Sequence, residues 1–283
     1  MTAAIAIAGL FALTQFTDLP VQFWGIVPEA KDLDAVNALK PSKTRAVVLI
    51  HGLLPRPLHS EKATVPEAHS WQNTKGSLVQ GLNDQFDVFG FSYAQTVTAD
   101  GVAHAKGLSD GVAALKKLGY QEIVLVGHSA GGIIARRFIE TYPDGGVTKV
   151  LTVATPHSGS GWTNVPSKFW PKPQIPFIES LSEEFRDTAT KCAKPLPKNV
   201  DICCVVCKLS RWSSDTMVHI RSQWPEDLQT QGVPAVLVRC NHFDAMTSPD
   251  SVKAIVDLTK GKVVRWKREE TTQAQRLLFG EKK

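Results

Sequence analysis

Short apolar runs and amphipathic stretches alternate along most of this sequence. The apolar runs are rich in β-branched residues, which is typical of buried strands. Several of the stretches between them have apolar residues three or four positions apart, as in helices that pack one face on a sheet. The predicted strands are 45–52, 86–93, 122–129, 148–156, 201–209 and 235–240. The predicted helices are 70–83, 102–118 with a gap at Gly107, 130–142, and 248–260 with Ser248 or Asp250 as its cap.

Strands that alternate with helices predict an α/β fold with a mostly parallel central sheet and helices on both faces. We expect a single domain over 1–283, with its core at about 45–260, because α/β folds reach this length without splitting. The alternation is interrupted at 157–200, which contains six prolines and several aromatic residues between two predicted strands. An insertion of this length and composition predicts a small cap or lid over the carboxyl edge of the sheet.

Composition and charge narrow the class of protein. The chain has 283 residues, of which 43% are hydrophobic, and this apolar content excludes a disordered chain. The formal net charge of +5 is carried entirely by residues 260–283, which contain eight basic and three acidic side chains. Nucleic acid is therefore not an expected partner, because a nucleic-acid-binding protein carries its basic face on the fold itself. The basic tail 261–283 fits an extra strand and helix packed on the domain, a weak contact with an anionic membrane surface, or a frayed end.

An apolar segment at 3–13 leaves the localisation open. It is too short to span a bilayer, which needs about 20 apolar residues. It fits the apolar region of a signal peptide, although no Lys or Arg precedes it and no clear cleavage site follows it. It fits equally well an apolar first strand or short helix, so both a cytoplasmic and an exported protein agree with the sequence.

Five cysteines raise the questions of a metal site and of a disulfide. Cys203, Cys204 and Cys207 lie in one predicted strand, whereas a zinc site needs four convergent ligands, commonly from two CxxC pairs. Only one such pair is present in the sequence, so we expect small buried thiols and no metal. A disulfide between Cys192 and one of this group is the alternative, and it would indicate an oxidising compartment.

Residues 127–131 read Gly-His-Ser-Ala-Gly and match the pattern G-x-S-x-G. The motif lies where the predicted strand 122–129 passes into the predicted helix 130–142. A tight turn at this place is expected to hold Ser129 in a strained conformation so that its hydroxyl projects from the sheet edge, and the flanking glycines avoid clashes with the neighbouring strand and helix. Ser129 is therefore the candidate nucleophile, and an ordinary serine at a helix N-cap is the alternative.

A serine hydroxyl needs a base to remove its proton, and the base needs an acid to orient it. His242 follows the predicted strand 235–240, and Asp215 follows the predicted strand 201–209, so both are expected at the carboxyl edge of the sheet. The chain order Ser129, Asp215, His242 is that of hydrolases built on an α/β sheet. Other residues compete for the roles of base and acid, but they lie within the motif, too close to their partner along the chain, or on other loops. They are His128, His219, Asp144, Asp201 and Asp244.

The tetrahedral oxyanion of acyl transfer needs two backbone donors. The N–H of Ala130 lies at the start of the predicted helix, where the helix dipole also favours negative charge. The second donor should come from the loop after the predicted strand 45–52, and the N–H of Leu53 is the best candidate there. Because both donors are backbone groups, a change of side chain does not remove them.

Together these motifs resemble the α/β-hydrolase superfamily, specifically its lipase and esterase branch. The resemblance covers about residues 45–258, and its most specific part is similar to the TPH-x-GS stretch of bacterial triacylglycerol lipases and GPI-inositol-deacylase-like lipases. The segments that carry it are VLIHGLL (48–54), LVGHSAGG (125–132), VATPHSGS (153–160), SSDTMV (213–218) and CNHFD (240–244). The sequence departs from the family at two places. The acid is often followed by Gly in the family, whereas Asp215 is followed by Thr216. The segment 54–70 is longer and more polar than the short Gly-containing loop of many lipases.

The resemblance implies hydrolysis of carboxylic esters through an acyl-enzyme and without a cofactor. It assigns Ser129 as nucleophile, Asp215 as acid, His242 as base, and the N–H groups of Leu53 and Ala130 as oxyanion donors. Transfer of the acyl group to another acceptor, cleavage of a thioester or amide, and an inactive binding protein are the alternatives. The expected partner is a small-molecule ester or a lipid. Aromatic residues of the insertion line an apolar cap over the substrate or form the insertion's own small core: Trp162, Phe169, Trp170 and Phe177.

Overall fold

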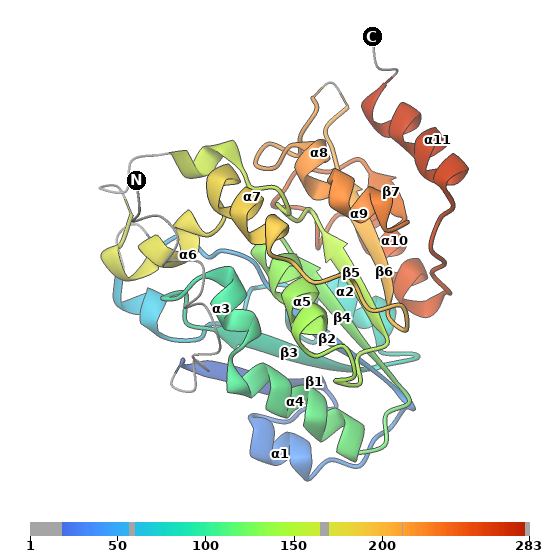
Figure 1. Ribbon diagram of the computed structural model, residues 1–283. Coiled ribbons are helices and arrows are strands. Elements are labelled where there is room, and N and C mark those ends of the chain that lie inside the picture. Colours follow the sequence, from blue (N-terminus) through green and yellow to red (C-terminus); the bar gives the residue numbers. More distant parts are fainter. Residues whose placement is uncertain (1–18, 57–59, 165–169, 211, 281–283) are drawn as a thin grey trace.

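The computed structural model describes residues 19–56, 60–164, 170–210 and 212–280. Its centre is one seven-stranded sheet with the strand order β1-β3-β2-β4-β5-β6-β7 (Figure 1). Only the pair β1 and β3 is antiparallel among the paired strands of the described chain, and the other pairs are parallel. The predicted α/β fold with a mostly parallel sheet is therefore confirmed.

All six predicted strands are present, with ends that differ by a few residues. They are β2 (Arg45–Ile50), β3 (Asp87–Tyr93), β4 (Glu122–His128), β5 (Lys149–Val153), β6 (Asp201–Cys207) and β7 (Ala235–Val238). A further strand, β1 (Val21–Val27), was not predicted. Gln22 and Gly25 interrupt its apolar pattern, and the pairing with β3 shifts register between Gly25 and Val27, so its sequence lacks the unbroken run of a central strand.

The helices follow the strands in the expected alternation. They are α1 (Leu33–Asn37), α2 (Ser77–Leu82), α3 (Ala99–Ala103), α4 (Lys106–Lys117), α5 (Ala130–Thr141), α6 (Ile175–Glu179), α7 (Glu183–Lys191), α8 (Ile220–Gln223), α9 (Glu226–Thr230), α10 (Pro249–Lys260) and α11 (Arg268–Phe279). Within the described residues, the short 3₁₀ helices are η1 (Ser60–Thr64), η2 (Gly161–Asn164) and η4 (Lys172–Gln174).

Two helix predictions need correction. The predicted helix 70–83 forms only as α2, because the Asn73 side chain and the backbone of Gly76 close turns before it. The predicted helix 102–118 is two helices, and the break lies at His104 and Ala105 rather than at Gly107. Gly107 lies inside α4, where it is packed against Val21 of β1 and has no room for a side chain.

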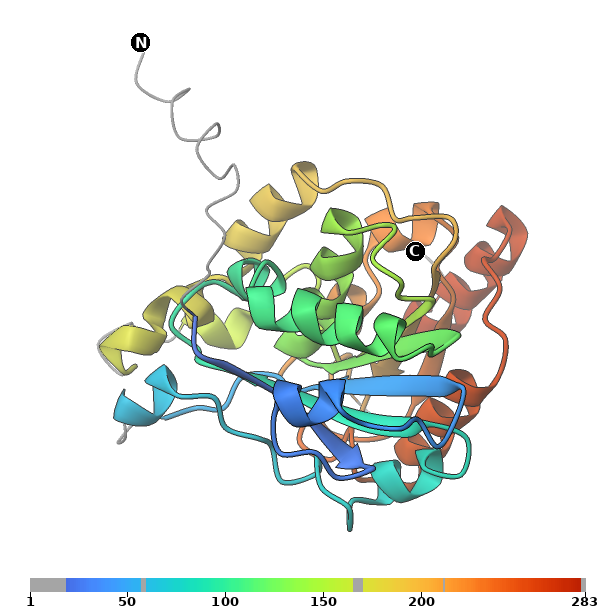
Figure 2. The same ribbon diagram turned by 90° about the horizontal axis from the view of Figure 1, so that it is seen from below.

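The sheet separates two layers of apolar side chains, and helices cover both of its faces (Figure 2). On β2, Ala46, Val48 and Ile50 pack toward α4 and α5, whereas Val47 and Leu49 pack toward α2 and α10. The other central strands alternate in the same way, as expected for strands buried on both faces. This architecture brings the carboxyl ends of the parallel strands to one edge, where ligands bind in open α/β sheets.

The segment 157–200 contains η2, η4, α6 and α7, which lie on the α3 side of the molecule in Figure 1. Phe177 of α6 is fully buried and joins the main core beside Tyr93, at 5.8 Å between ring centroids. Trp162 and Trp170 pack against each other at 5.3 Å. These three aromatic side chains thus pack against other aromatic side chains of the protein. Phe169 lies outside the described residues. The role of the segment as a cap stays a prediction.

The basic tail forms α11, which packs on the domain through Leu278 and Phe279. The prediction of an extra strand in this tail is wrong, because residues 262–267 do not pair with any strand. They are held instead by contacts such as the Trp266 N–H donating to the Gly232 carbonyl at 2.7 Å. The side chain of Trp266 also packs on that of Trp224, at 5.9 Å between ring centroids.

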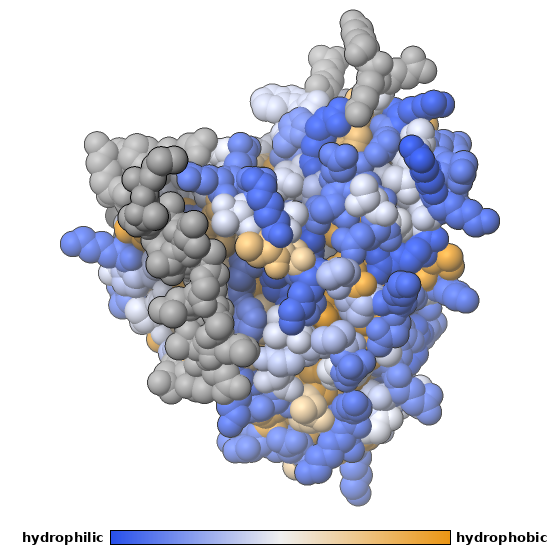
Figure 3. Space-filling view, in the orientation of Figure 1, coloured by the Kyte–Doolittle hydropathy of each residue, from blue (hydrophilic) through white to orange (hydrophobic). Residues whose placement is uncertain are grey.

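The visible face in Figure 3 is largely hydrophilic, and its apolar residues form small separate patches. All five cysteines are described, and none of them forms a disulfide, so the alternative pairing of Cys192 is wrong. Within the described ranges, no helix has both the length and the apolar character to span a membrane. The apolar segment 3–13 lies outside the described residues.

Candidate active site

Ser129 lies at the sharp turn between β4 and α5. Its φ of 54° and ψ of −125° fall in a region that non-glycine residues rarely adopt. The turn is held by the Ser129 N–H, which donates to the Val153 carbonyl at 2.8 Å, and by very close approach of backbone around the motif glycines. A side chain at Gly127 would overlap the Gly131 carbonyl, and one at Gly131 would overlap the carbonyls of Ile50 and His51 at the end of β2. The strained position of Ser129 therefore depends on glycine at both places.

Ser129, His242 and Asp215 form a continuous hydrogen-bonded chain. The His242 Nε2 lies 3.0 Å from the Ser129 Oγ, and the His242 Nδ1 lies 2.7 Å from the Asp215 Oδ2. All three side chains are buried. With neutral imidazole, Nδ1–H donates to the carboxylate and Nε2 is free to accept the serine proton, which is the arrangement that a general base requires.

The two loops that carry Asp215 and His242 are also joined to each other. The His242 N–H donates to the Asp215 carbonyl at 2.7 Å. The second carboxylate oxygen of Asp215 accepts from the N–H groups of Met217 and Val218, at 2.9 and 2.7 Å. Asp215 is fully buried, so these bonds hold its carboxylate in one orientation toward His242.

The oxyanion candidates lie beside the serine. A Cβ on Gly52 would come within 2.6 Å of the Ser129 Cβ, so the backbone of the loop after β2 directly abuts the turn. Among the described residues, neither the Leu53 N–H nor the Ala130 N–H donates a hydrogen bond to the protein. The neighbouring Leu54 N–H, in contrast, is occupied by the Gln95 side chain at 3.0 Å. Two backbone donors are thus left without a protein acceptor, one directly after Ser129 and one directly after Gly52, which abuts the turn.

His128, which was weighed only as a competing base, has a different place in the site. Its Nε2 lies 3.1 Å from the His242 carbonyl, and its ring lies 5.0 Å from the His242 ring. Because the acceptor is a carbonyl, the His128 ring donates this bond. Burial holds the pKa of His128 well below its ordinary value, so the ring stays neutral. His128 thus supports the loop of His242, and only its position inside the motif could have indicated this.

His51 supports the opposite side of the site. Its Nδ1 donates to the Gly52 carbonyl at 2.7 Å, and its ring stacks on Tyr93 at 4.7 Å. The Tyr93 hydroxyl in turn donates to the His51 carbonyl at 2.7 Å. Burial lowers the pKa of His51 to about 4, so this ring is neutral as well. The histidine and the tyrosine therefore fix the end of β2 where the loop with Leu53 begins.

The TPHSGS stretch connects the loop after β5 with the loop that carries Asp215. The Ser160 hydroxyl donates to the Met217 carbonyl, and the Ser222 hydroxyl donates to the Gly159 carbonyl at 2.6 Å. Thr155 packs so closely on Gly132 of α5 that a side chain there would overlap it. The motif therefore acts here as a structural support between the turn at Ser129 and the loop that carries Asp215.

The remaining candidates serve local roles. His219 caps α8 by accepting from the Arg221 N–H at 3.2 Å, and Asp244 accepts from the Asn241 amide of its own loop. Asp201 begins β6 at the amino edge of the sheet, and Asp144 lies in the turn after α5. Across the described ranges, no three His, Cys, Asp or Glu side chains are grouped so that they could hold a metal ion.

Comparisons with known proteins agree with this architecture. The sequence model of the alpha/beta hydrolase fold family matches residues 45–196. The mature lipase of Bacillus licheniformis is 14% identical and aligns with a TM-score of 0.60 over 78% of this chain and 92% of its own. A monoacylglycerol lipase from Paleococcus ferrophilus is 16% identical, with a TM-score of 0.52 over 86% of this chain and 98% of its own.

A phospholipase from Legionella pneumophila is 15% identical and aligns with a TM-score of 0.57 over 84% of this chain and 63% of its own. No curated protein matches the sequence. At these identities the structural likeness concerns the fold.

Proposed function

Because the chain belongs to the α/β-hydrolase fold family, we propose that it is a serine hydrolase that cleaves carboxylic esters through an acyl-enzyme intermediate. The observation that carries the proposal is the chain of contacts from Ser129 through His242 to Asp215, at 3.0 and 2.7 Å. A strained serine that is hydrogen-bonded to a histidine, which a buried carboxylate in turn orients, is the arrangement expected of an activated nucleophile. A binding protein would not need all three groups in this geometry.

In the first half of the proposed reaction, the Ser129 Oγ attacks the ester carbonyl carbon while the His242 Nε2 takes the hydroxyl proton. Asp215 holds the imidazole in the productive tautomer and stabilises the imidazolium that forms. The carbonyl oxygen becomes an oxyanion that accepts hydrogen bonds from the N–H groups of Leu53 and Ala130. Each such donor is worth about 2.7–4 kcal/mol in the transition state.

Collapse of the tetrahedral intermediate breaks the bond to the alcohol oxygen, which leaves with the proton from His242. Water then attacks the acyl-enzyme, His242 takes a proton from that water, and the same oxyanion site stabilises the second intermediate. The carboxylic acid is released, and Ser129 regains its proton from His242. Besides the ester and water, the proposed cycle uses side chains and backbone groups of this chain.

The proposed substrates are esters with an apolar acyl group, including lipids. Two observations support this class: the structural neighbours are named as lipases and a phospholipase, and exposed aromatic side chains lie on the loops of the acid and the base. Phe243 directly follows His242 and has 68% of its side chain exposed, and Trp212 precedes Asp215 and is 62% exposed. Profiling p-nitrophenyl esters from acetate to palmitate measures the preferred chain length.

The decisive test is Ser129→Ala. We expect it to reduce ester hydrolysis by about 10⁴-fold or more and to abolish labelling by a fluorophosphonate probe. Ser109→Ala on α4 is the matched control, since its exposed hydroxyl donates to the Lys106 carbonyl of its own helix. Ester hydrolysis that survives in the Ser129 variant at the wild-type rate would refute the proposal. Added alcohol acceptors distinguish hydrolysis from acyl transfer.

A further inference from the structure

Two buried glutamines meet at the loop that follows β2. Gln95 lies just after β3 and is 3% exposed, and Gln174 lies in η4 of the insertion and is fully buried. The Gln174 Nε2 donates to the Gln95 Oε1 at 2.7 Å. A carboxamide is costly to bury unless its donors and acceptors are paired, so the partners of these two groups indicate what they do.

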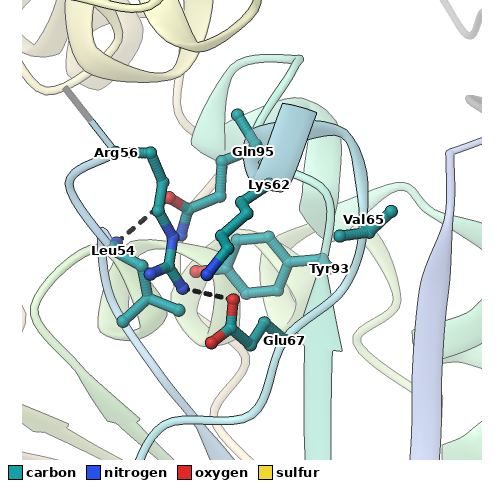
Figure 4. Close-up of a pocket in the computed structure, with 8 residues that line it drawn as sticks. Leu54, Arg56, Lys62, Val65, Glu67, Tyr93 and Gln95 are labelled. Atoms are coloured by element: carbon teal, nitrogen blue, oxygen red, sulfur yellow. Dashed lines mark hydrogen bonds and ion pairs between the residues drawn. The ribbon is translucent and has the colours of Figure 1, made fainter. Parts of the chain in front are cut away.

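The Gln95 carboxamide brackets Leu53. Its Nε2 donates to the Gly52 carbonyl at 2.9 Å, and its Oε1 accepts from the Leu54 N–H at 3.0 Å. Figure 4 shows this side chain turned toward Leu54 at the wall of a small pocket that Arg56 and Tyr93 also line. The peptide groups on either side of the Leu53 residue are therefore both held by one side chain.

Gln174 holds the same loop from the insertion. Its Nε2 also donates to the Leu54 carbonyl at 2.8 Å, and its Oε1 accepts from the Arg56 N–H at 3.3 Å. The insertion contacts the domain elsewhere as well, through the Ser180 hydroxyl with the Ala99 N–H and through Arg186 with Asp100. Those contacts go to α3, whereas Gln174 reaches the loop next to Ser129.

We propose that Gln95 and Gln174 are positioning residues that aim the Leu53 N–H at the reaction oxyanion, and that Gln174 makes this donor depend on the docked insertion. The inference rests on the proposed function, because it assigns the two side chains to the oxyanion site of that reaction. Leu53 itself has no turn or helix that would fix its N–H. Three loop positions, Gly52, Leu54 and Arg56, are instead bound by side chains from elsewhere in the chain.

The test compares an oxoester with the matching thionoester, in which sulfur replaces the carbonyl oxygen. Sulfur accepts hydrogen bonds more weakly, so the preference for the oxoester measures how well the oxyanion donors are placed. Gln174→Met and Gln95→Met keep the side-chain length and remove the hydrogen bonds. We expect the ratio of oxoester to thionoester kcat/KM to fall by about tenfold in each variant. The double variant should lose little more, because the two carboxamides act as one unit.

Gln223→Met is the matched control. Gln223 is buried and ties the acid loop in the same manner, since it accepts from the Cys207 N–H at 2.7 Å and donates to the Val218 carbonyl at 3.0 Å. Its loss should lower the rates for both esters together and leave their ratio at the wild-type value. An unfolding measurement on each variant reports the cost to stability separately. If Gln174→Met does not fold, Gln174→Glu keeps the shape and loses the donated bonds, and the same fall in the ratio is expected.

An unchanged ratio in the folded Gln95 and Gln174 variants, or an equal fall in Gln223→Met, would overturn the inference and leave both glutamines as structural groups. A wild-type protein that hydrolyses no ester would instead overturn the proposed function, and the oxyanion role with it. The two failures are distinguishable because the first is read in variants of an active enzyme and the second in the wild type.

Discussion

The turn that carries Ser129 and the loop that carries Leu53 face each other across the site, yet they are held in opposite ways. The turn is held by its own backbone, with motif glycines packed against the carbonyls of neighbouring strand and helix. The loop is held by side chains from far along the chain, above all Gln95 and Gln174. The turn at Ser129 therefore requires glycines without side chains, whereas the Leu53 loop requires the side chains that bind it.

This difference has a consequence for how each half of the site responds to mutation. Backbone packed at contact distance has no room to adjust, so a single added methyl group must move a strand or a helix. A loop held by hydrogen bonds loses them one by one and can shift by small amounts. We therefore expect a substitution in the turn at Ser129 to destabilise the fold at once. A substitution around the Leu53 loop should instead displace the Leu53 N–H before it destabilises the fold.

The largest effect is expected from Gly131→Ala. Alanine is the better helix former by about 1 kcal/mol, so helix propensity alone predicts a gain in stability. The new methyl group would instead overlap the Ile50 carbonyl and lie 2.6 Å from the His51 carbonyl. We expect a loss of about 3 kcal/mol in the free energy of unfolding, measured in urea, together with loss of esterase activity.

Gly161→Ala is the control for Gly131→Ala, because a Cβ there would meet only the Glu183 carboxylate at 4.0 Å. It should change stability by less than about 0.5 kcal/mol. Stability gained in Gly131→Ala would contradict the claim that backbone contact holds the serine turn.

The next largest effect is a loss of stability on acidification through the neutral His51, which lies where the Leu53 loop begins. Its pKa is lowered by burial to about 4, whereas in the unfolded chain it returns to about 6.5. Between these values the unfolded state binds a proton that the folded state does not, so stability falls as the pH falls from 6.5 toward 4. From pH 6.5 to pH 5, we expect this group to account for a loss of about 1.6 kcal/mol in the free energy of unfolding, measured in urea.

His51→Phe isolates that contribution. Phenylalanine keeps a flat ring to stack on Tyr93 and cannot titrate. The variant should be less stable near neutral pH, since the bond to the Gly52 carbonyl is lost, but should lose less stability on acidification. An unchanged pH slope in this variant would show that other groups, such as the buried His128 and His157, produce the whole acid sensitivity.

The smallest effect, and one of opposite sign, is expected at Thr216. This exposed residue follows Asp215 with a φ of 90°, a conformation that favours glycine and is unusual for a β-branched side chain. Unlike Ser129, which is also strained, Thr216 has a side chain that takes no part in the proposed chemistry. Thr216→Gly should raise the free energy of unfolding by about 1 kcal/mol and leave kcat/KM unchanged.

Thr216→Ala separates the two contributions to that strain, because it removes the β-branch and keeps the Cβ. Its gain should be clearly smaller than that of the glycine variant in the same thermal or urea unfolding measurement. A glycine variant that is less stable than wild type would mean that the threonine contributes contacts that outweigh its backbone conformation.

Much of the fold followed from local patterns. Central strands such as β4 and β6 are buried on both faces, so they read as unbroken apolar runs and were predicted correctly. β1 escaped prediction because it is an edge strand with a register shift, and its apolar pattern is interrupted. Gly107 was taken as a break in a helix, but its small size serves packing against Val21, a contact with a strand that had not been predicted.

The sequence by itself determined the alternation of strands and helices and the position of Ser129 at a strand-to-helix turn, because these depend on neighbouring residues and on glycines within a few positions. It also put His242 and Asp215 on loops after successive strands, as candidates among several. Only the tertiary structure brought His242 to within 3.0 Å of Ser129 and Asp215 to within 2.7 Å of His242, and revealed the supports around them. Gln95 and Gln174 act on residues 43 and 120 positions away, and contacts over such separations leave no local pattern from which they could be predicted.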